Sequence, residues 1–224
     1  MFDRLELLIG KDNLNKIKTK NILVIGCGGV GGNCITSLIR SGIENITLID
    51  FDKVDISNIN RQEVAYLSTV GKSKVESMKN ILLDINNNVK VNAIDMYLDE
   101  SNIKEIFDNN KFDYVIDACD SIKTKEAIIL ECINRNIKFI TCTGTGYRLH
   151  PEMLKITELK KTSGDPLARI LRKWAKDNRI KSKIIVCSSD EIPIAKGSTI
   201  ASCSFVPPSA GLLITSYVIN DIIK

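Results

Sequence analysis

The sequence predicts an α/β fold, in which a mostly parallel sheet carries helices on both of its faces. A short β-branched run at residues 21–25 (N-I-L-V-I) leads through a glycine turn into a helix-like segment, and a second strand-like run follows at 45–50. Strand-like and helix-like segments then continue to alternate as far as residue 143. A strand, a crossover helix and a further strand form a βαβ unit, which makes its strands parallel.

The individual elements follow from the spacing of apolar residues. The first twenty residues are predicted to form short helices, and the helix after the glycine turn is expected to end at Arg40, before Ser41 and Gly42. The same spacing predicts helices at residues 73–85, 101–107, 122–136 and 210–223, with strands at 89–94, 114–117 and 138–143. The helix at 210–223 is broken by polar residues and is shorter than the roughly 20 apolar residues of a membrane span, so we interpret it as a core helix.

The composition restricts the class of protein. With 224 residues, 44% of them hydrophobic, the chain can bury one core and is too short for two full-sized domains. It begins without a signal sequence, its seven cysteines form no C-x-x-C pair, and its net charge of +4 does not by itself indicate nucleic-acid binding. We therefore expect a cytoplasmic protein with no disulfide framework, no zinc and no stable membrane insertion.

The glycine turn reads G-C-G-G-V-G-G, residues 26–32, and satisfies G-x-G-x-x-G through Gly26, Gly28 and Gly31. Glycine is needed here because a side chain would keep a phosphate away from the backbone amides at the start of the helix. Asp50 follows about 20 residues later, where a ribose-binding acid is expected. The pattern indicates a nucleotide site in a Rossmann-like fold, and the turn alone leaves the identity of the nucleotide open.

The segment after Asp50 favours a triphosphate. It reads D-F-D-K-V-D-I-S-N-I-N-R-Q, residues 50–62, and is followed by T-V-G-K-S-K, residues 69–74. Arg61 and Lys74 can neutralise charge that builds on the β- and γ-phosphates, and Asn58 can donate to the same oxygens. A dehydrogenase has no need of these groups, whereas a reaction that expels pyrophosphate has.

A third motif, D-A-C-D-S at residues 117–121, places Asp117 and Asp120 at the carboxyl end of a predicted parallel strand. This is the usual ligand edge of such sheets, and an acid there can hold a Mg²⁺ ion that bridges phosphates. Taken singly, Arg61 can be a surface ion-pair partner, Lys74 a solvated residue and Asp120 a helix N-cap. Taken together in one βαβ frame, they indicate a site for a nucleoside triphosphate and Mg²⁺.

In this order the motifs resemble those of the ubiquitin-activating, ThiF and MoeB superfamily, whose members adenylate a carboxylate with ATP and Mg²⁺. The resemblance implies that Asp50 holds the ribose, that Arg61 and Lys74 bind the triphosphate, and that Asp120 lies at the metal and the α-phosphate. The full set of nucleotide-binding residues that it implies is Gly26, Gly28, Gly29, Gly31, Asp50, Asp52, Ser57, Asn58, Arg61, Lys74, Asp120 and Ser121.

The N-terminal segment R-L-E-L-L-I-G, residues 4–10, resembles the superfamily segment whose arginine reaches into the active site of a partner subunit. The resemblance therefore implies a homodimer, in which Arg4 joins Arg61, Lys74 and Asp120 as a catalytic residue. ThiF and MoeB proteins usually carry two C-x-x-C pairs for structural zinc, and this sequence has none.

Three later segments resemble one branch of the superfamily, the tRNA threonylcarbamoyladenosine dehydratases. They are K-T-S-G-D-P-L-A-R-I-L-R at 161–172, V-C-S-S-D-E-I-P at 186–193 and S-F-V-P-P-S-A-G at 204–211. In that family ATP activates the threonyl carboxylate of a modified adenosine next to the tRNA anticodon, and ring closure then expels AMP. The implied substrate is tRNA that carries threonylcarbamoyladenosine, and the implied reaction is its ATP-dependent dehydration, or cyclisation.

A basic segment at residues 155–183 carries ten Lys or Arg and three acids, a net charge of +7 in a chain whose total is +4. Helical spacing is expected to turn Leu167, Ile170, Leu171 and Trp174 toward the core. Four cations then face outward, namely Arg169, Arg172, Lys173 and Lys176. They can be phosphate ligands for tRNA or an ordinary solvated helix face. With the resemblance, we favour tRNA binding.

These inferences give one ThiF-type adenylating domain over residues 1–224, with a nucleotide-binding core at 1–150 and a substrate-binding elaboration with a closing helix at 151–224. The main alternative is an adenylyltransferase that activates the C-terminal glycine of a ubiquitin-like sulfur carrier protein. A dinucleotide-dependent oxidoreductase and a non-catalytic nucleotide-binding scaffold are disfavoured by the phosphate-handling residues. Nothing around Cys187 is typical of an activated thiolate, so no thioester is expected.

Overall fold

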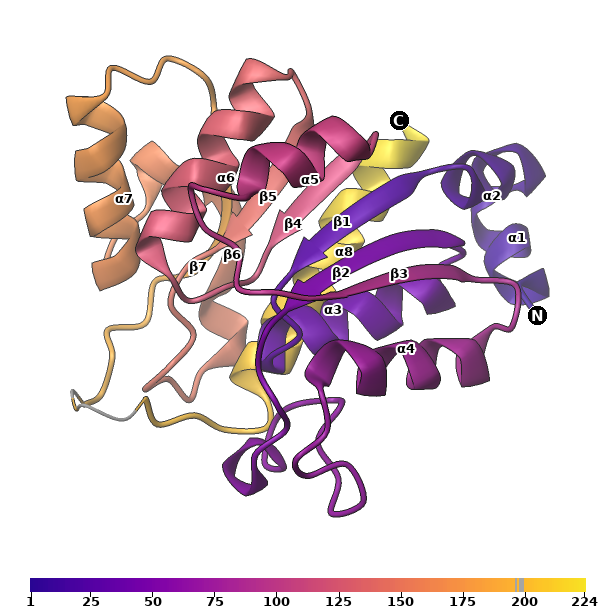
Figure 1. The fold of residues 1–224 in the computed structure, drawn as a ribbon. Coiled ribbons are helices and arrows are strands. Elements are labelled where there is room, and N and C mark those ends of the chain that lie inside the picture. The colour runs from indigo at the N-terminus through magenta and orange to yellow at the C-terminus, as the bar shows by residue number, and fades with distance from the viewer. Residues whose placement is uncertain (196, 198–199) are drawn as a thin grey trace.

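Seven strands form one sheet in the order β3-β2-β1-β4-β5-β7-β6 in the computed structural model, which describes residues 1–195, 197 and 200–224 (Figure 1). Neighbouring strands are parallel except for β6, which pairs antiparallel with β7 at one edge. The strands are β1 (Asn21–Ile25), β2 (Asn45–Asp50), β3 (Lys90–Asp95), β4 (Tyr114–Asp117), β5 (Lys138–Cys142), β6 (Leu154–Glu158) and β7 (Ile185–Ser189).

Helices cover both faces of the sheet (Figure 1). They are α1 (Asp3–Ile9), α2 (Lys11–Lys18), α3 (Gly29–Arg40), α4 (Lys74–Ile85), α5 (Ile103–Asn109), α6 (Ile122–Asn134), α7 (Pro166–Asp177) and α8 (Val206–Ile223). Alternate residues of β1 divide the core: Ile22 and Val24 pack with α3, α4 and α8, whereas Leu23 and Ile25 pack with α5 and α6. Because side chains alternate across a strand, a continuous apolar run such as β1 is buried on both faces.

The predicted α/β class is confirmed, and the strands β1 to β5 lie within one residue of their predicted ends. The helices α4, α5 and α6 lie within two residues of theirs. Strands β6 and β7 were not predicted. They lie beyond residue 143, where β6 (L-K-I-T-E) has only five residues and its two apolar side chains alternate with polar ones inside the basic segment, which leaves a weak strand signal.

Helix α8 packs as a core helix, as predicted. Its length and composition satisfy the criteria for a membrane span, but half of the helix is buried within the structure. Gly211 permits this burial, because a β-carbon there would lie 2.4 Å from the carbonyl oxygen of Val30 and 2.8 Å from the amide of Cys34 on α3. The absence of a side chain thus lets the backbones of α8 and α3 approach closely.

The rotation of α7 differs from the prediction. Its buried residues are Ala168 and Leu171, with Ala175 partly buried, and Ile170 is 44% exposed. The prediction that Ile170 faces the core is therefore wrong. Two alanines lie in the contact stripe, and their small side chains gave no strong apolar signal in the sequence.

The glycine turn supplies the first prediction. A β-carbon at Gly31 would lie 1.8 Å from the carbonyl oxygen of Gly26, whereas one at the adjacent Gly32 would meet nothing closer than 3.4 Å. We expect Gly31→Ala to lower the free energy of unfolding by about 1–3 kcal/mol or more, because the turn must open. Gly32→Ala should instead be neutral or raise it by up to about 1 kcal/mol, because alanine favours a helix interior. Urea denaturation of both variants measures this, and equal effects would contradict the argument.

Candidate active site

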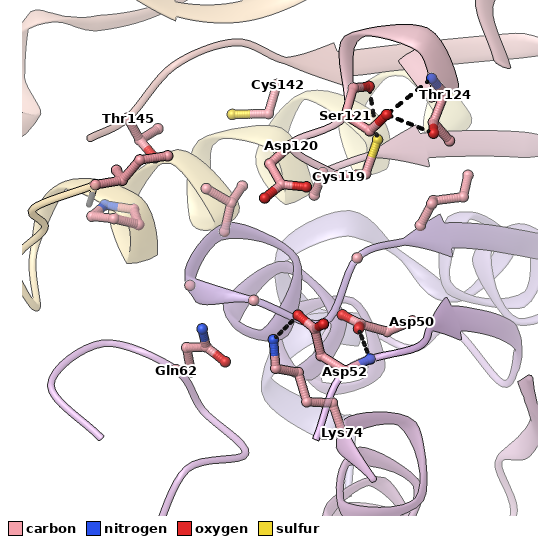
Figure 2. Close-up of a pocket in the computed structure, with 18 of the residues that line it drawn as sticks. Asp50, Asp52, Gln62, Lys74, Cys119, Asp120, Ser121, Thr124, Cys142 and Thr145 are labelled. Carbon is pink, nitrogen blue, oxygen red and sulfur yellow. Dashed lines mark hydrogen bonds and ion pairs between the residues drawn. The ribbon is translucent and has the colours of Figure 1, made fainter. Parts of the chain in front are cut away.

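A cavity of about 430 Å³ opens at the carboxyl edge of the sheet (Figure 2). It lies between the neighbouring strands β1 and β4, where the strand order reverses. The next strand after β1 is β2 on one side, and the next strand after β4 is β5 on the other side. In open parallel sheets this reversal of strand order leaves a crevice between the loops, and ligands bind there. The walls come from the glycine turn, from the start of α4 and from the segments that follow β2, β3, β4 and β5.

The glycine turn forms the floor of the cavity. Gly26 adopts φ +95°, and a β-carbon on it would lie 2.7 Å from the carbonyl oxygen of Ala118 on the neighbouring loop. Gly28 is the N-cap of α3, and Gly26, Gly28 and Gly29 line the cavity. The amide groups and positive end of the α3 dipole therefore face the space in which a phosphate would lie.

Asp50 closes the turn from the end of β2. Its Oδ2 accepts the Cys27 amide at 2.6 Å and its Oδ1 accepts the Asp52 amide at 2.9 Å. Burial raises the pKa of the Asp50 carboxyl above its ordinary value, against the opposing effects of the Lys74 charge and the two amides. Each carboxylate oxygen retains a lone pair, so Asp50 can still accept a ribose hydroxyl.

Lys74 begins α4, is 5% exposed and places its Nζ 2.7 Å from Asp52 Oδ2 (Figure 2). The alternative that Lys74 is a solvated surface residue is therefore wrong. Asp52 compensates the burial of the ammonium group and holds it against the cavity wall. A bound triphosphate would offer Lys74 a second anionic partner at the same place.

Arg61 and Asn58 reach the cavity from the segment between β2 and α4, where a short 3₁₀ turn spans Ile56–Asn58. The Arg61 Nη1 donates to the Ser57 carbonyl at 3.1 Å and to Asn60 Oδ1 at 2.7 Å. The Asn58 Oδ1 accepts the Asp55 amide at 3.0 Å, so its amide nitrogen is the group that can donate to a phosphate. Ser57 is exposed and does not line the cavity; its backbone carbonyl orients Arg61 instead.

The two aspartates of D-A-C-D-S have different environments. Asp117 is fully buried, lies 3.0 Å from Lys125 Nζ and accepts a hydrogen bond from the Thr141 hydroxyl. Burial alone would lower the pKa of Lys125, but the charge of Asp117 raises it above its ordinary value. The expectation that Asp117 is available at the ligand edge is therefore wrong, because its charge is already neutralised by Lys125.

Asp120 remains exposed and lines the cavity, opposite the Lys74–Asp52 pair (Figure 2). Ser121 is the N-cap of α6: its Oγ accepts the Thr124 amide at 3.3 Å and the Thr124 hydroxyl at 2.9 Å. Asp120 is therefore not the cap. Its carboxylate oxygens suit Mg²⁺, which prefers hard oxygen ligands. In the part of the chain that the structure describes, no three His, Cys, Asp or Glu residues gather as a metal site, so phosphates would have to supply further ligands.

The structure adds wall residues that the sequence analysis missed. Phe51 and Tyr97 pack edge to face with ring centroids 4.8 Å apart, beside Asp50. Residues 142–146, at the end of β5 and directly after it, form another part of the wall, and the buried Gln62 lines the cavity as well. Their common signal was position, since Phe51, Tyr97 and this glycine-rich stretch each follow the carboxyl end of a strand.

Arg4 lies on α1 and does not line the cavity of its own chain. Helices α1 and α2 precede β1 and lie beyond the amino end of that strand, whereas the cavity is at its carboxyl end (Figure 1). On α1 the side chains of Leu7 and Leu8 are 88% and 80% exposed. A role for Arg4 in catalysis thus requires a second chain.

The four predicted tRNA ligands on α7 separate into two groups. Arg169, Lys173 and Lys176 are exposed. Arg172 is half-buried, and its Nη1 donates to the carbonyl at 2.9 Å and to the hydroxyl of Thr162. The prediction that Arg172 faces outward with the other three is wrong, because α7 is rotated toward its alanine stripe. Leu167, in the first turn of α7, lines the cavity.

Cys187 is 1% exposed on β7. A hydrogen bond with Cys142 and burial raise the pKa of its thiol well above the ordinary value. A thiolate is the nucleophilic form of cysteine, so this environment opposes a thioester role.

Comparison with known proteins places the site in context. The ThiF family model matches residues 2–217. The tRNA threonylcarbamoyladenosine dehydratase of Bacillus subtilis (strain 168) is 37% identical over 100% of this chain and 94% of its own length. The structure of the E. coli tRNA N6-threonylcarbamoyladenosine dehydratase, TcdA, in complex with ATP has a TM-score of 0.93 at 31% identity, over 99% of this chain and 93% of that one.

The AMP complex of the same E. coli protein has a TM-score of 0.91 at 31% identity, over 97% of this chain and 92% of that one. A more distant relative, the molybdopterin-synthase adenylyltransferase of Haemophilus influenzae, is 30% identical over 75% of this chain and 66% of its own length.

The buried ion pair beneath the cavity supplies the second prediction. Lys125→Met should lower the free energy of unfolding by about 3–5 kcal/mol, because Asp117 is left buried without its counter-charge. The matched control is Lys123→Met on the same helix, because the Lys123 side chain is 79% exposed and its Nζ lies 3.4 Å from Glu126. The effect of this control should stay below about 1 kcal/mol. Urea denaturation distinguishes the two, and the double variant Lys125→Met/Asp117→Asn should recover part of the loss. A small effect of Lys125→Met alone would contradict the burial argument.

Proposed function

This chain belongs to the ThiF family, and we propose that it is an ATP-dependent dehydratase that cyclises threonylcarbamoyladenosine in tRNA. The observation that carries the proposal is the convergence of Arg61, Lys74 and Asp120 on one cavity beside the glycine turn, in a chain that matches a named dehydratase over its full length. The substrate class is also the reason to propose a cytoplasmic location.

ATP binding follows from the cavity walls. The glycine turn and the N-terminus of α3 receive the phosphates, Asp50 accepts a ribose hydroxyl, and Arg61, Lys74 and Asn58 contact the β- and γ-phosphates. Asp120 would hold Mg²⁺, which when bound supplies positive charge to the phosphate oxygens. Asp52 holds the Lys74 ammonium at the position where it is needed.

The first chemical step transfers AMP to the threonyl carboxylate. A carboxylate oxygen attacks the α-phosphorus, the bond to the bridging oxygen breaks, and pyrophosphate leaves with the negative charge. Arg61 and Lys74 stabilise this charge as it develops, because their cationic groups are already fixed by Ser57, Asn60 and Asp52.

The second step closes the ring. The carbamoyl part of the modified adenosine attacks the activated carbonyl carbon and releases an N–H proton to solvent, the carbon–oxygen bond to AMP breaks, and AMP leaves. The substrate has then lost one water in total, and ATP has become AMP and pyrophosphate. No enzyme nucleophile is needed, which agrees with the buried environment of Cys187.

The alternative, activation of the C-terminal glycine of a ubiquitin-like sulfur carrier, shares the adenylation step. The partial similarity to molybdopterin-synthase adenylyltransferase reflects that common step. The basic segment at 155–183 and the exposed Arg169, Lys173 and Lys176 favour a polyanionic substrate.

The direct test is nucleoside analysis of tRNA after incubation with the protein, ATP and Mg²⁺. We expect threonylcarbamoyladenosine to be replaced by a nucleoside lighter by one water, with one AMP formed per nucleoside. Reactions with NAD in place of ATP should leave the tRNA unchanged. Unaltered tRNA together with adenylation of a sulfur carrier protein would replace the proposal by its alternative.

The same assay supplies the third prediction. Arg61→Ala and Lys74→Ala should each lower turnover by about a hundredfold or more, because each removes a charge that stabilises the departing pyrophosphate. Lys53→Ala is the matched control, since Lys53 is exposed in the same segment and does not line the cavity. Near-normal turnover of both cavity variants would show that the residues are assigned to the wrong roles.

A fourth prediction addresses the homodimer that we propose. Arg4→Ala and Asp120→Ala should each be inactive, and a mixture of the two should regain up to about a quarter of wild-type turnover, because random exchange leaves one complete composite site in half of the dimers. Turnover is measured after subunit exchange has been verified with differently tagged chains. Absence of recovery in verified mixed dimers would exclude an arginine supplied across the interface.

A further inference from the structure

A second cavity, of about 390 Å³, lies beside the C-terminal half of α7 and shares no residue with the active-site cavity. Apolar side chains line part of it: Leu159, Ala175, Ile180 and Ile184. Charged side chains line the rest: Glu158, Lys160, Arg172, Lys176, Lys181 and Lys183. Together with Ser182, these residues define the basic cavity.

The charges of the basic cavity are unbalanced. Five of its residues are cations and one, Glu158, is an acid. Lys160 and Lys183 lie 2.8 and 3.9 Å from the Glu158 carboxylate, which Lys161 also approaches at 3.8 Å. The hydrogen bond from Lys160 holds the pKa of Glu158 below its ordinary value, so this acid stays ionised. Within the described residues Lys176 and Lys181 have no ion pair, and a net positive charge remains at the rim.

The apolar floor is part of the packed core. Leu159 and Ile184 are 3% and 5% exposed and belong to a buried cluster against which Ala175 and Ile180 also pack. Arg172 is fixed at the wall by its hydrogen bonds to Thr162. Its planar guanidinium is thereby held in one orientation, as a surface on which a flat ring can stack.

The apolar floor, the cationic rim and the volume of the basic cavity together indicate which class of ligand it can bind. About 300–1,000 Å³ is typical of cavities that enclose small ligands, and 390 Å³ falls in this range. A nucleotide unit has the complementary distribution, with a flat base that is desolvated readily and phosphates that require cations. Unstacked bases of single-stranded RNA loops are recognised in this way, by stacking on a side-chain plane beside backbone phosphate contacts.

Helix α7 links the basic cavity to the active site. Leu167 lines the active-site cavity and Ala175 lines the basic cavity, eight residues apart on the same helix. At about 1.5 Å per residue they are separated by roughly 12 Å along the helix axis. A strand of RNA crosses this distance within a few nucleotides, so one tRNA can reach both cavities.

We propose that the basic cavity binds one unstacked base of the tRNA, a few nucleotides from the adenosine whose threonyl carboxylate is activated. This inference rests on the proposed function for its substrate and adds a second anchoring point for it. The rim cations neutralise the phosphates on either side of the bound base, and the active site receives the modified adenosine at the other end of α7.

The first test fills the cavity without changing its charge. Ala175→Trp should weaken tRNA binding about tenfold or more and leave its salt dependence unchanged, because a stacked base is lost and no phosphate contact is. Lys181→Glu/Lys183→Glu should weaken binding and also make the salt dependence less steep. Lys11→Glu/Lys16→Glu on α2 is the charge-matched control and should change affinity less than twofold. Filter binding at several salt concentrations measures all of these affinities.

ATP affinity serves as the check on folding, and it should be unchanged in Ala175→Trp because the two cavities share no residue. If the wild type dehydrates tRNA and a folded Ala175→Trp binds tRNA normally, the inference is wrong and the proposed function stands. If the wild type does not dehydrate tRNA but Ala175→Trp still weakens RNA binding, the inference stands and the proposed function is wrong.

A second measurement needs no variant. An anticodon stem-loop RNA carries 2-aminopurine at one loop position at a time, and its fluorescence is titrated with wild-type protein. We expect a saturable change at one loop position other than the modified adenosine, because only that base leaves the stack to enter the basic cavity. Equal responses at every position, or a response only at the adenosine itself, would overturn the inference.

Discussion

The arrangement of the active site depends on the close approach of two backbone segments that only glycine permits. Gly31 lies so near Gly26 that a β-carbon would fall 1.8 Å from its carbonyl oxygen, and Gly26 in turn lies against Ala118. This approach brings the N-terminus of α3 into the crevice between β1 and β4. Other groups are then placed relative to the turn. Asp50 accepts the Cys27 amide, and Pro207 of α8 and the Arg61 side chain pack 3.1 and 3.4 Å from where a β-carbon of Gly29 would lie. A turn without side chains thus fixes the α3 dipole, Asp50 and Arg61 in one frame.

Within that frame, each cation near the cavity already has a partner, and the kind of partner decides its role. Lys125 and Asp117 are 1% and 0% exposed and neutralise each other, so neither can change partner without leaving a buried charge. Lys74 is buried too, but its partner Asp52 has a side chain that is 46% exposed. Water can therefore solvate Asp52 when a phosphate draws the Lys74 ammonium away, whereas Asp117 has no such compensation. This difference separates a structural ion pair from one that can exchange its anion during the reaction.

The sequence predicted the features that depend on local patterns, and it missed those that depend on contacts between residues far apart in the chain. The strands β1 to β5 and the glycine turn are local patterns, so their positions were predicted to within one residue. The structural role of Asp117 was not predicted, because it depends on Lys125 of the following helix α6 and on Thr141 of the neighbouring strand β5. The rotation of α7 was also missed, since Ala168 and Ala175 carry little apolar signal and Arg172 is drawn inward by Thr162, ten residues away. Residues 142–146 became recognisable as a wall only after the sheet order placed β5 beside β4.

A buried carboxylate connects α7 to the wall of the active-site cavity. This connection explains how an adenylating domain can position a specific substrate relative to the nucleotide. Asp165, which is 2% exposed, is the N-cap of α7 and accepts the amides of Leu167 and Ala168 at 2.9 and 3.1 Å. The same carboxylate accepts the Gly144 amide at 3.1 Å and the Ser188 hydroxyl at 3.2 Å. Gly144 lines the active-site cavity, so one buried carboxylate joins α7, the cavity wall and β7. Breaking the hydrogen bonds of a buried carboxylate costs free energy. Helix α7 therefore cannot turn or slide without disturbing the cavity wall. The direction in which α7 leaves the active site is therefore coupled to the cavity wall. A polyanion bound along this helix, as we propose, would be held in register with the nucleotide.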